Sequence, residues 1–507
     1  MLSIPTLLAF VVLCAVGIPV TRYFLDPKGL RKYPSAGLSG ITSLWSMWHN
    51  RKMKRFMAIH EAHQRLGPIV RVEPNHLSFS SPEAFSDIYS HSATDILKDV
   101  FYDAIAGPFR SSGNTRSREE HTRKRRTIAS SFSPKGVAEY EGYVIKAVQS
   151  LLDRLEKLQA QCGDNGFNAT PWIHMFTFDA IGDVVFGNSF NFLENGNDTC
   201  TAETPEGKQY QVEAIASFLG GVKFANNVGY LGTDLAKWLK KNILYCSYGA
   251  KMGANFSNMS IYRIRRREEI PEETAPHDIW SRVMAANRKP GGYVMPFGEL
   301  IAESNSLLNA GNDTIGSALT SLMYHLARNQ AAQKKLQEEI ISAFPPGVQV
   351  CSNDAVKDIQ YLRNCIDEAL RERPPVGIGL PRITPPQGCV IAGQKIPGNT
   401  TVSVPTWSVH HDPDLFPDPF EFKPERWTDE KQLPALKKFS LPFSTGGRAC
   451  VGRNLAYMEL QIAVASIFNQ FHVELVDPNA ELDTLEWFNS SPGELWVKVT
   501  PRLSIAL

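Results

Sequence analysis

The 507-residue sequence has almost no net charge, because 53 lysine and arginine residues are balanced by 52 aspartate and glutamate residues. Without a basic excess the chain has no global attraction to nucleic acid, and we expect none as a partner. The eight cysteines form no CxxC pair, which argues against a disulfide framework and against a zinc site of common spacing. Internal repeats and a GxGxxG dinucleotide-binding motif are also lacking. The informative signals are therefore local.

The first of these signals is an uncharged N-terminal run that ends at Arg22. About 20 helical residues, at about 1.5 Å of rise each, span a hydrocarbon core of about 30 Å. The basic residues all follow the run, which predicts that the folded part of the chain stays on the cytoplasmic side. A cleaved secretory peptide processed at residues 15–17 is the alternative, but the basic stretch that precedes such a peptide is missing. The pattern favours a single-pass transmembrane signal anchor at residues 1–22.

Beyond this run, Gly, Pro and Ser predict a linker at residues 23–45, and residues 46–507 are predicted to form one domain. Periodicity indicates a mainly α fold with minor β. Helices are expected at residues 116–132, 297–328 and 359–373, the last ending before two prolines. Short strands are expected at residues 69–80 and 390–409, and a polar surface loop at residues 191–205.

The most specific stretch is PFSTGGRACVGRNLAYMEL, residues 442–460. Its glycines permit close approach to a bulky group, and Arg448 offers a planar cation that suits a carboxylate. Cys450 precedes a helix predicted to start near Val451, whose dipole would favour a thiolate. An electron-rich thiolate is a suitable axial ligand for haem iron, with Arg448 on a porphyrin propionate. A lone cysteine is more often a small buried apolar residue, but these neighbours argue for the ligand.

The pattern Phe443, Gly446, Arg448, Cys450 and Gly452 resembles the haem-binding signature of the cytochrome P450 monooxygenases. This resemblance implies the P450 fold and a haem b cofactor, iron protoporphyrin IX, with Cys450 as the metal ligand. Phe443 and Arg448 would then belong to the cofactor-binding set. A chain of this length is expected to match all five positions by chance on the order of once in ten thousand sequences.

Other motifs of the same family occur in this sequence, in the same order along the chain. Glu368 and Arg371 lie three residues apart on one helix face, and a segment like Pro424 to Trp427 supplies the family's partner arginine, here Arg426. Taken alone, such a pair is more often a solvated surface pair. The resemblance implies instead a buried network that supports folding and haem retention.

The weak helix formers of AGNDT, residues 310–314, predict a local opening in the long helix. A tolerated irregularity is the alternative. The segment resembles the family's oxygen-activation motif, which implies that Thr314, assisted by Asp313, relays protons during catalysis.

Three further residues match positions of the family that bind propionates: His121, Arg125 and Arg382. His121 stands where the family usually has tryptophan, so its assignment departs from the pattern. Solvated surface residues are the alternative for all three. Lys124 and Arg126 of the same basic helix are expected to dock the acidic surface of a reductase.

The resemblance thus implies a monooxygenase anchored in the endoplasmic reticulum membrane, with the catalytic domain in the cytoplasm. It would use O2 and electrons from NADPH, delivered by a separate NADPH-cytochrome reductase because the chain lacks its own dinucleotide motif. Several stretches, among them KDVFYDAI and TVSVPTWSVH, are most similar to fungal benzoate para-hydroxylases, which suggests a small aromatic substrate. Polyketide or terpenoid oxidation, a haem-thiolate isomerase or dehydratase, and a non-enzymatic haem sensor or membrane scaffold are the alternatives.

Overall fold

The computed structural model describes residues 4–229, 238, 242, 244–344 and 348–502. Helices dominate, as the sequence predicts. Their bounds are α1 Ile4–Leu25, α2 Leu44–Arg51, α3 Arg55–Leu66, α4 Pro82–Tyr89, α5 Phe101–Ile105, α6 Arg118–Ala129, α7 Pro134–Ala138, α8 Glu141–Cys162, α9 Thr170–Phe186, α10 Phe192–Asn195, α11 Ala214–Gly229, α13 Leu244–Glu268, α14 Ile279–Asn287, α15 Phe297–Arg328, α16 Gln330–Ala343, α17 Asn353–Val356, α18 Gln360–Glu372, α19 Thr406–His410, α20 Leu433–Phe439 and α21 Arg453–Gln470.

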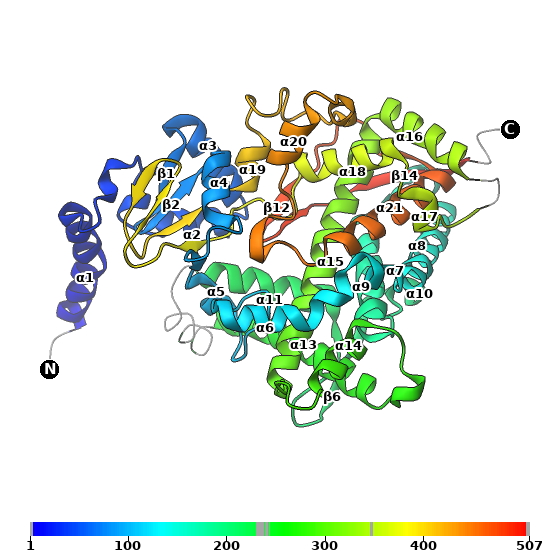
Figure 1. Ribbon diagram of the computed structural model, residues 1–507, viewed down its shortest axis with the longest axis horizontal. Coiled ribbons are helices and arrows are strands. Elements are labelled where there is room, and N and C mark those ends of the chain that lie inside the picture. The colour runs from blue at the N-terminus through cyan, green and yellow to red at the C-terminus, as the bar shows by residue number, and fades with distance from the viewer. Residues whose placement is uncertain (1–3, 230–237, 239–241, 243, 345–347, 503–507) are drawn as a thin grey trace.

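Within these described ranges, the strands are short and form five separate sheets. Their bounds are β1 Ile69–Glu73, β2 His76–Phe79, β3 Leu97–Lys98, β4 Phe167–Asn168, β5 Thr199–Glu203, β6 Gln209–Glu213, β7 Arg382–Ile383, β8 Cys389–Ile391, β9 Gln394–Ile396, β10 Thr401–Ser403, β11 Phe471–Leu475, β12 Thr484–Glu486, β13 Ser490–Pro492 and β14 Trp496–Pro501. The largest sheet has the order β1-β2-β10-β7-β3. It lies beside α3 and α4, toward the N-terminal end of the molecule (Figure 1).

The long helix α15 runs through the middle of the helical part (Figure 1). Most of its residues between Leu307 and Ala327 are buried, because apolar side chains on several faces pack against α9, α18 and α21. Its bounds agree with the helix predicted at residues 297–328, and α18 agrees closely with the helix predicted at residues 359–373.

Residues 191–205 do not form the expected surface loop. They contain α10 and β5, and β5 pairs with β6 in an antiparallel hairpin. Cys200 and Ala202 of β5 are buried, so alternate side chains of this polar segment pack inward. The loop prediction was wrong because composition alone does not reveal a partner strand further along the chain.

At the N-terminal end, α1 covers most of the uncharged run. In the described part of the chain, no helix has the length and apolar character that crossing a bilayer requires. Within residues 23–45, Leu30, Tyr33 and Ala36 are buried, and Ser35 pairs with Arg71 of β1. Part of this segment therefore packs on the domain.

Candidate active site

The cysteine loop lies between α20 and α21 and is fixed by the backbone. The Cys450 amide donates to the Phe443 carbonyl at 2.9 Å, and Gly452 is the residue before α21 begins. Gly446 has φ of 73°, and a Cβ there would lie 2.1 Å from the Tyr89 carbonyl oxygen. This glycine is therefore needed for packing against the end of α4, whereas the sequence suggested approach to a bound group.

Cys450 lines a large cavity, and its exposed surface faces that cavity. Burial raises the pKa of its thiol, while the Gly452 amide and the charges of Arg125 and Arg453 partly oppose that rise. A thiol in this setting becomes a stable thiolate when it binds a metal cation, because coordination displaces the proton.

The cavity has a volume of about 1040 Å³ and is mostly apolar. Four of the residues predicted from the sequence line it: Thr314, Phe443, Arg448 and Cys450. Aromatic side chains form much of the remaining wall, among them Phe101, Phe109, Phe218, Phe224, Phe256 and Phe488. A large, mainly apolar cavity with a thiol at one wall suits a flat, apolar metal macrocycle together with an organic substrate.

A cluster of basic side chains lies beside this cavity. In the large sheet, Lys98 of β3 stands directly opposite Arg382 of β7, although like charges in this position are destabilising. Lys98 is buried, and burial together with Arg382 and Arg448 holds the pKa of Lys98 well below its usual value. His121 is also buried. Burial, followed by Arg448 and Arg125, lowers the pKa of its imidazole to about 3.

This cluster, formed by Lys98, His121, Arg125, Arg382 and Arg448, explains how the predicted propionate residues come together. Burial lowers the pKa of Arg448 to about 10, as do Arg382 and Arg125, while Tyr102 and Glu120 oppose the shift. The guanidinium charges of Arg125, Arg382 and Arg448, held this close, favour an anionic partner. The two propionates of haem would supply it, so the residues present fit this cofactor.

Lys98 is the member of this cluster that we did not predict. It lines the cavity, its ammonium lies 4.2 Å from the centre of the Tyr102 ring, and it donates to the Gly113 carbonyl. No spacing in the sequence connects Lys98 with Arg382, 284 positions later, because their meeting depends on strand pairing.

Backbone contacts hold the other arginines in place. Arg125 of α6 donates to the Ala449 carbonyl at 2.7 Å, and Arg448 donates to the Thr115 carbonyl at 2.8 Å. One bond joins α6 to the cysteine loop and the other joins the loop to the segment just before α6, so the cluster and the thiol are held by neighbouring contacts.

Thr314 faces the cavity from α15, and its hydroxyl donates to the Ala310 carbonyl at 2.7 Å. Such a bond to the carbonyl one turn earlier is a common local perturbation of helices. The helix is continuous from Phe297 to Arg328, so the local opening expected at residues 310–314 is not present.

Asp313 lies on another face of α15 and is fully buried. Its Oδ2 accepts hydrogen bonds from Trp487 Nε1 at 3.1 Å and from Asn489 Nδ2 at 2.9 Å. Burial raises the pKa of the carboxyl, and His174 partly opposes the rise. Asp313 therefore holds the turn between β12 and β13, where Phe488 has φ of 109° and faces the cavity. Its assistance to Thr314 stays a prediction.

The predicted pairing of Glu368 with two arginines is confirmed. Arg371 donates to both carboxylate oxygens, at 2.9 and 3.0 Å, and Arg426 Nε lies 3.0 Å from Oε1. Trp427 Nε1 and the Lys423 amide complete the set, each at 3.0 Å. The network joins α18 to the segment that leads toward the cysteine loop.

Lys124 departs from its expected role in reductase docking. It is buried, and its ammonium lies 2.8 Å from the Glu299 carboxylate of α15. This prediction was wrong because the sequence gives the charge of a helix but not which side chains face inward. Arg126 of the same helix is exposed, as docking requires.

Comparison with known proteins agrees with this geometry. A family model described as Cytochrome P450 matches residues 37–499. Benzoate 4-monooxygenase bphA of Aspergillus niger is 30% identical over 492 residues, covering 94% of both chains. Cytochrome P450 monooxygenase atr2 of Stereocaulon alpinum is 33% identical over 493 residues, covering 96% of this chain and 91% of the relative. Cytochrome P450 monooxygenase cicH of Emericella nidulans is 29% identical over 499 residues, covering 95% and 96%. The chain therefore belongs to the cytochrome P450 family and is an oxidoreductase that incorporates molecular oxygen.

Proposed function

We propose that the chain binds haem b through Cys450 and hydroxylates a small aromatic substrate, using O2 and electrons from NADPH. The observation that carries the proposal is that Cys450 and Thr314 line one cavity together with Lys98 and Arg448 of the basic cluster. The thiol supplies the metal ligand, the cluster supplies cations for the propionates, and the aromatic walls supply a surface for a flat apolar substrate.

When bound, the haem would supply the redox chemistry that cleaves dioxygen. The protein's own residues bind and orient the reactants. Thr314 presents a hydroxyl that holds a proton at the cavity wall, and positioned proton transfer of this kind contributes about 10² to 10⁴ in rate. The apolar walls limit access of water to the reacting atoms. Asp313 contributes by holding the turn that carries Phe488.

We also propose a NADPH-cytochrome reductase as the electron donor, since the chain has no dinucleotide-binding motif. The exposed Arg126 remains a candidate contact for its acidic surface, whereas Lys124 does not. Anchoring of residues 1–22 in the endoplasmic reticulum membrane, with the domain in the cytoplasm, is part of the proposal. Its support is the uncharged run and the basic residues after it.

The aromatic substrate rests on the similarity to a benzoate 4-monooxygenase and on the aromatic walls. Purified protein with a reductase and NADPH should be given ¹⁸O2 and a panel of benzoates, phenols, polyketides and terpenes. We expect one labelled oxygen atom in an aromatic product, measured by mass spectrometry. Labelled terpenes or non-aromatic polyketides alone would refute the aromatic assignment. Product without label would refute oxygen insertion and favour an isomerase or dehydratase.

A further inference from the structure

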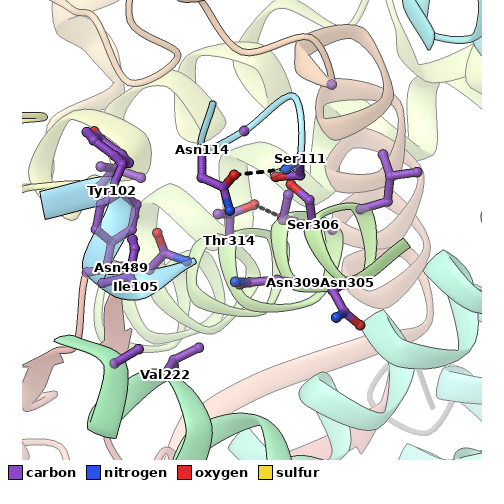
Figure 2. A pocket seen from close by; sticks show the side chains of 18 of the residues that line it. Tyr102, Ile105, Ser111, Asn114, Val222, Asn305, Ser306, Asn309, Thr314 and Asn489 are labelled. Atoms are coloured by element: carbon purple, nitrogen blue, oxygen red, sulfur yellow. Dashed lines mark hydrogen bonds between the residues drawn. The ribbon is translucent and has the colours of Figure 1, made fainter. Parts of the chain in front are cut away.

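Six asparagines are among the described residues that line the cavity, and three of them come from three elements that meet near Thr314. Asn114 comes from the loop before α6, Asn309 from α15, and Asn489 from the turn between β12 and β13. Figure 2 shows their carboxamide groups directed toward the same space near Thr314. This convergence is unusual in a cavity whose walls are mainly apolar, and it gives the space a defined polar side.

The hydrogen bonds inside the protein leave capacity in each of these amides. Asn309 has no side-chain partner among the described residues. Asn114 accepts a bond from the Ser111 amide at 2.8 Å through Oδ1, which leaves its nitrogen available. Asn489 donates to Asp313 at 2.9 Å, which leaves its oxygen available. The set therefore offers at least two N–H groups and two carbonyl oxygens to a ligand.

The charged side chains of the described residues that line the cavity leave no unassigned cation for an anion. Among the described lining residues, the Asp, Glu, Lys, Arg and His side chains are Lys98, Arg448 and Glu459. Lys98 and Arg448 donate to the carbonyls of Gly113 and Thr115, on either side of Asn114, but both belong to the basic cluster with which the haem propionates would pair. Glu459 lies on α21, after the cysteine loop, and burial raises the pKa of its carboxyl to about 8. With these two cations paired to the propionates, a carboxylate placed among the amides would lose water without gaining a free cation.

Aromatic rings line the same cavity beside Asn489. Phe488 is adjacent to Asn489, its ring is nearly parallel to that of Phe101 with centroids 6.2 Å apart, and Tyr102 meets it edge-on at 6.3 Å. All three rings line the cavity. A ligand with an aromatic body and one polar substituent can therefore contact both sides at once.

We propose that the substrate carries a neutral oxygen function, a hydroxyl or a carbonyl, and that Asn114, Asn309 and Asn489 bind it. This inference rests on the proposed function and narrows its aromatic substrate to an uncharged, already oxygenated one. Carboxamides both donate and accept, so they suit a phenol, a ketone or an ester. A hydrocarbon leaves the amides unpaired, and an anion lacks its counter-charge.

Three ligands of similar shape distinguish a neutral oxygen function from an anion and from a hydrocarbon. They are methyl benzoate, benzoate and ethylbenzene. Their dissociation constants should be measured with the haem-loaded protein, both by equilibrium dialysis and from the substrate-induced absorbance change. We expect methyl benzoate to bind about tenfold more tightly than either of the others, which corresponds to about one net hydrogen bond. Tighter binding of benzoate, or equal binding of ethylbenzene, overturns the proposal.

Asn309→Leu tests the amide directly, since this side chain makes no bond that folding would lose. Affinity for methyl benzoate should fall about tenfold, while affinity for ethylbenzene is unchanged or rises. Asn309→Gln keeps the carboxamide and should retain most of the affinity. Equal loss for both ligands in Asn309→Leu would show a steric effect and refute the assignment. The reduced, carbon-monoxide-bound spectrum checks haem loading independently, and its absence in wild type would instead refute the proposed function.

Discussion

Replacement of Arg371 by alanine tests the buried network that supports the site. The guanidinium donates two bonds to the Glu368 carboxylate and three more to the carbonyls of His410, Pro419 and Glu421, at 2.6 to 3.2 Å. The side chains of Arg371 and Glu368 both have 0% exposure. Truncation therefore leaves the buried carboxylate with Arg426 as its remaining cation and frees three carbonyls, and breaking a buried pair in this way costs about 3 to 5 kcal/mol. Against a typical stability of about 5 to 15 kcal/mol, little haem-loaded protein should remain.

Urea unfolding, followed by tryptophan fluorescence, and haem content per chain measure this loss. Lys357→Ala is the matched control, because its pair with Asp354 is exposed, with side-chain exposures of 47% and 83%, and contributes little to stability. Arg371→Lys should fall between the two, since an ammonium cannot make the two parallel bonds. If Arg371→Ala unfolds at the same urea concentration as Lys357→Ala, the network does not stabilise the fold.

Three further predictions follow from the site and its surroundings. Cys450→Ala should lack the red-shifted Soret band of a reduced, carbon-monoxide-bound thiolate haem. Asp313→Leu should lower stability by about 1 to 3 kcal/mol and raise KM, because the turn that carries Phe488 loses its anchor. Glu372→Gln should reduce the acid sensitivity of folding. Burial raises the pKa of Glu372, but His325 and Arg373 lower it further, to about 2 from the ordinary 4.5, so its contribution of about 3 kcal/mol is present above pH 4.5 and is lost as pH falls toward 2.

Each of these predictions has a contrary outcome. A normal Soret shift in Cys450→Ala would mean that another cysteine binds the iron. Unchanged KM and urea midpoint in Asp313→Leu would show that the turn is held by other contacts. For Glu372, parallel stability curves of variant and wild type between pH 4.5 and 2 would exclude the depressed pKa.

Sequence reasoning was most successful where chemistry is local. The bounds of α15 followed from apolar spacing, and the pairing of Glu368 with Arg371 followed from their separation on one helix face together with a family resemblance. The lining of the cavity by Cys450 and Thr314 also agrees with the motifs. These features depend on residues that are close in sequence, or on family motifs that identify which residues meet.

Features that depend on distant partners were not predictable in this way. Lys98 joins the basic cluster only because β3 pairs with β7, and Lys124 turns inward only because α6 packs near the acidic residues of α15. The orientation of Asp313 depends on the β12–β13 turn, which lies more than 170 residues later. The hairpin at residues 199–213 likewise needs a partner strand that composition does not identify.

The central claim is that the cavity shared by Cys450 and Thr314 inserts oxygen, with the Thr314 hydroxyl directing a proton. The most direct measurement is the coupling of product to NADPH consumption in wild type, Thr314→Ala and the control Thr314→Ser, with haem loading and substrate affinity determined for each. The account predicts that Thr314→Ala still consumes NADPH and O2 but forms less product per NADPH and more hydrogen peroxide, while Thr314→Ser retains most of the coupling. Equal coupling in wild type and Thr314→Ala would contradict it.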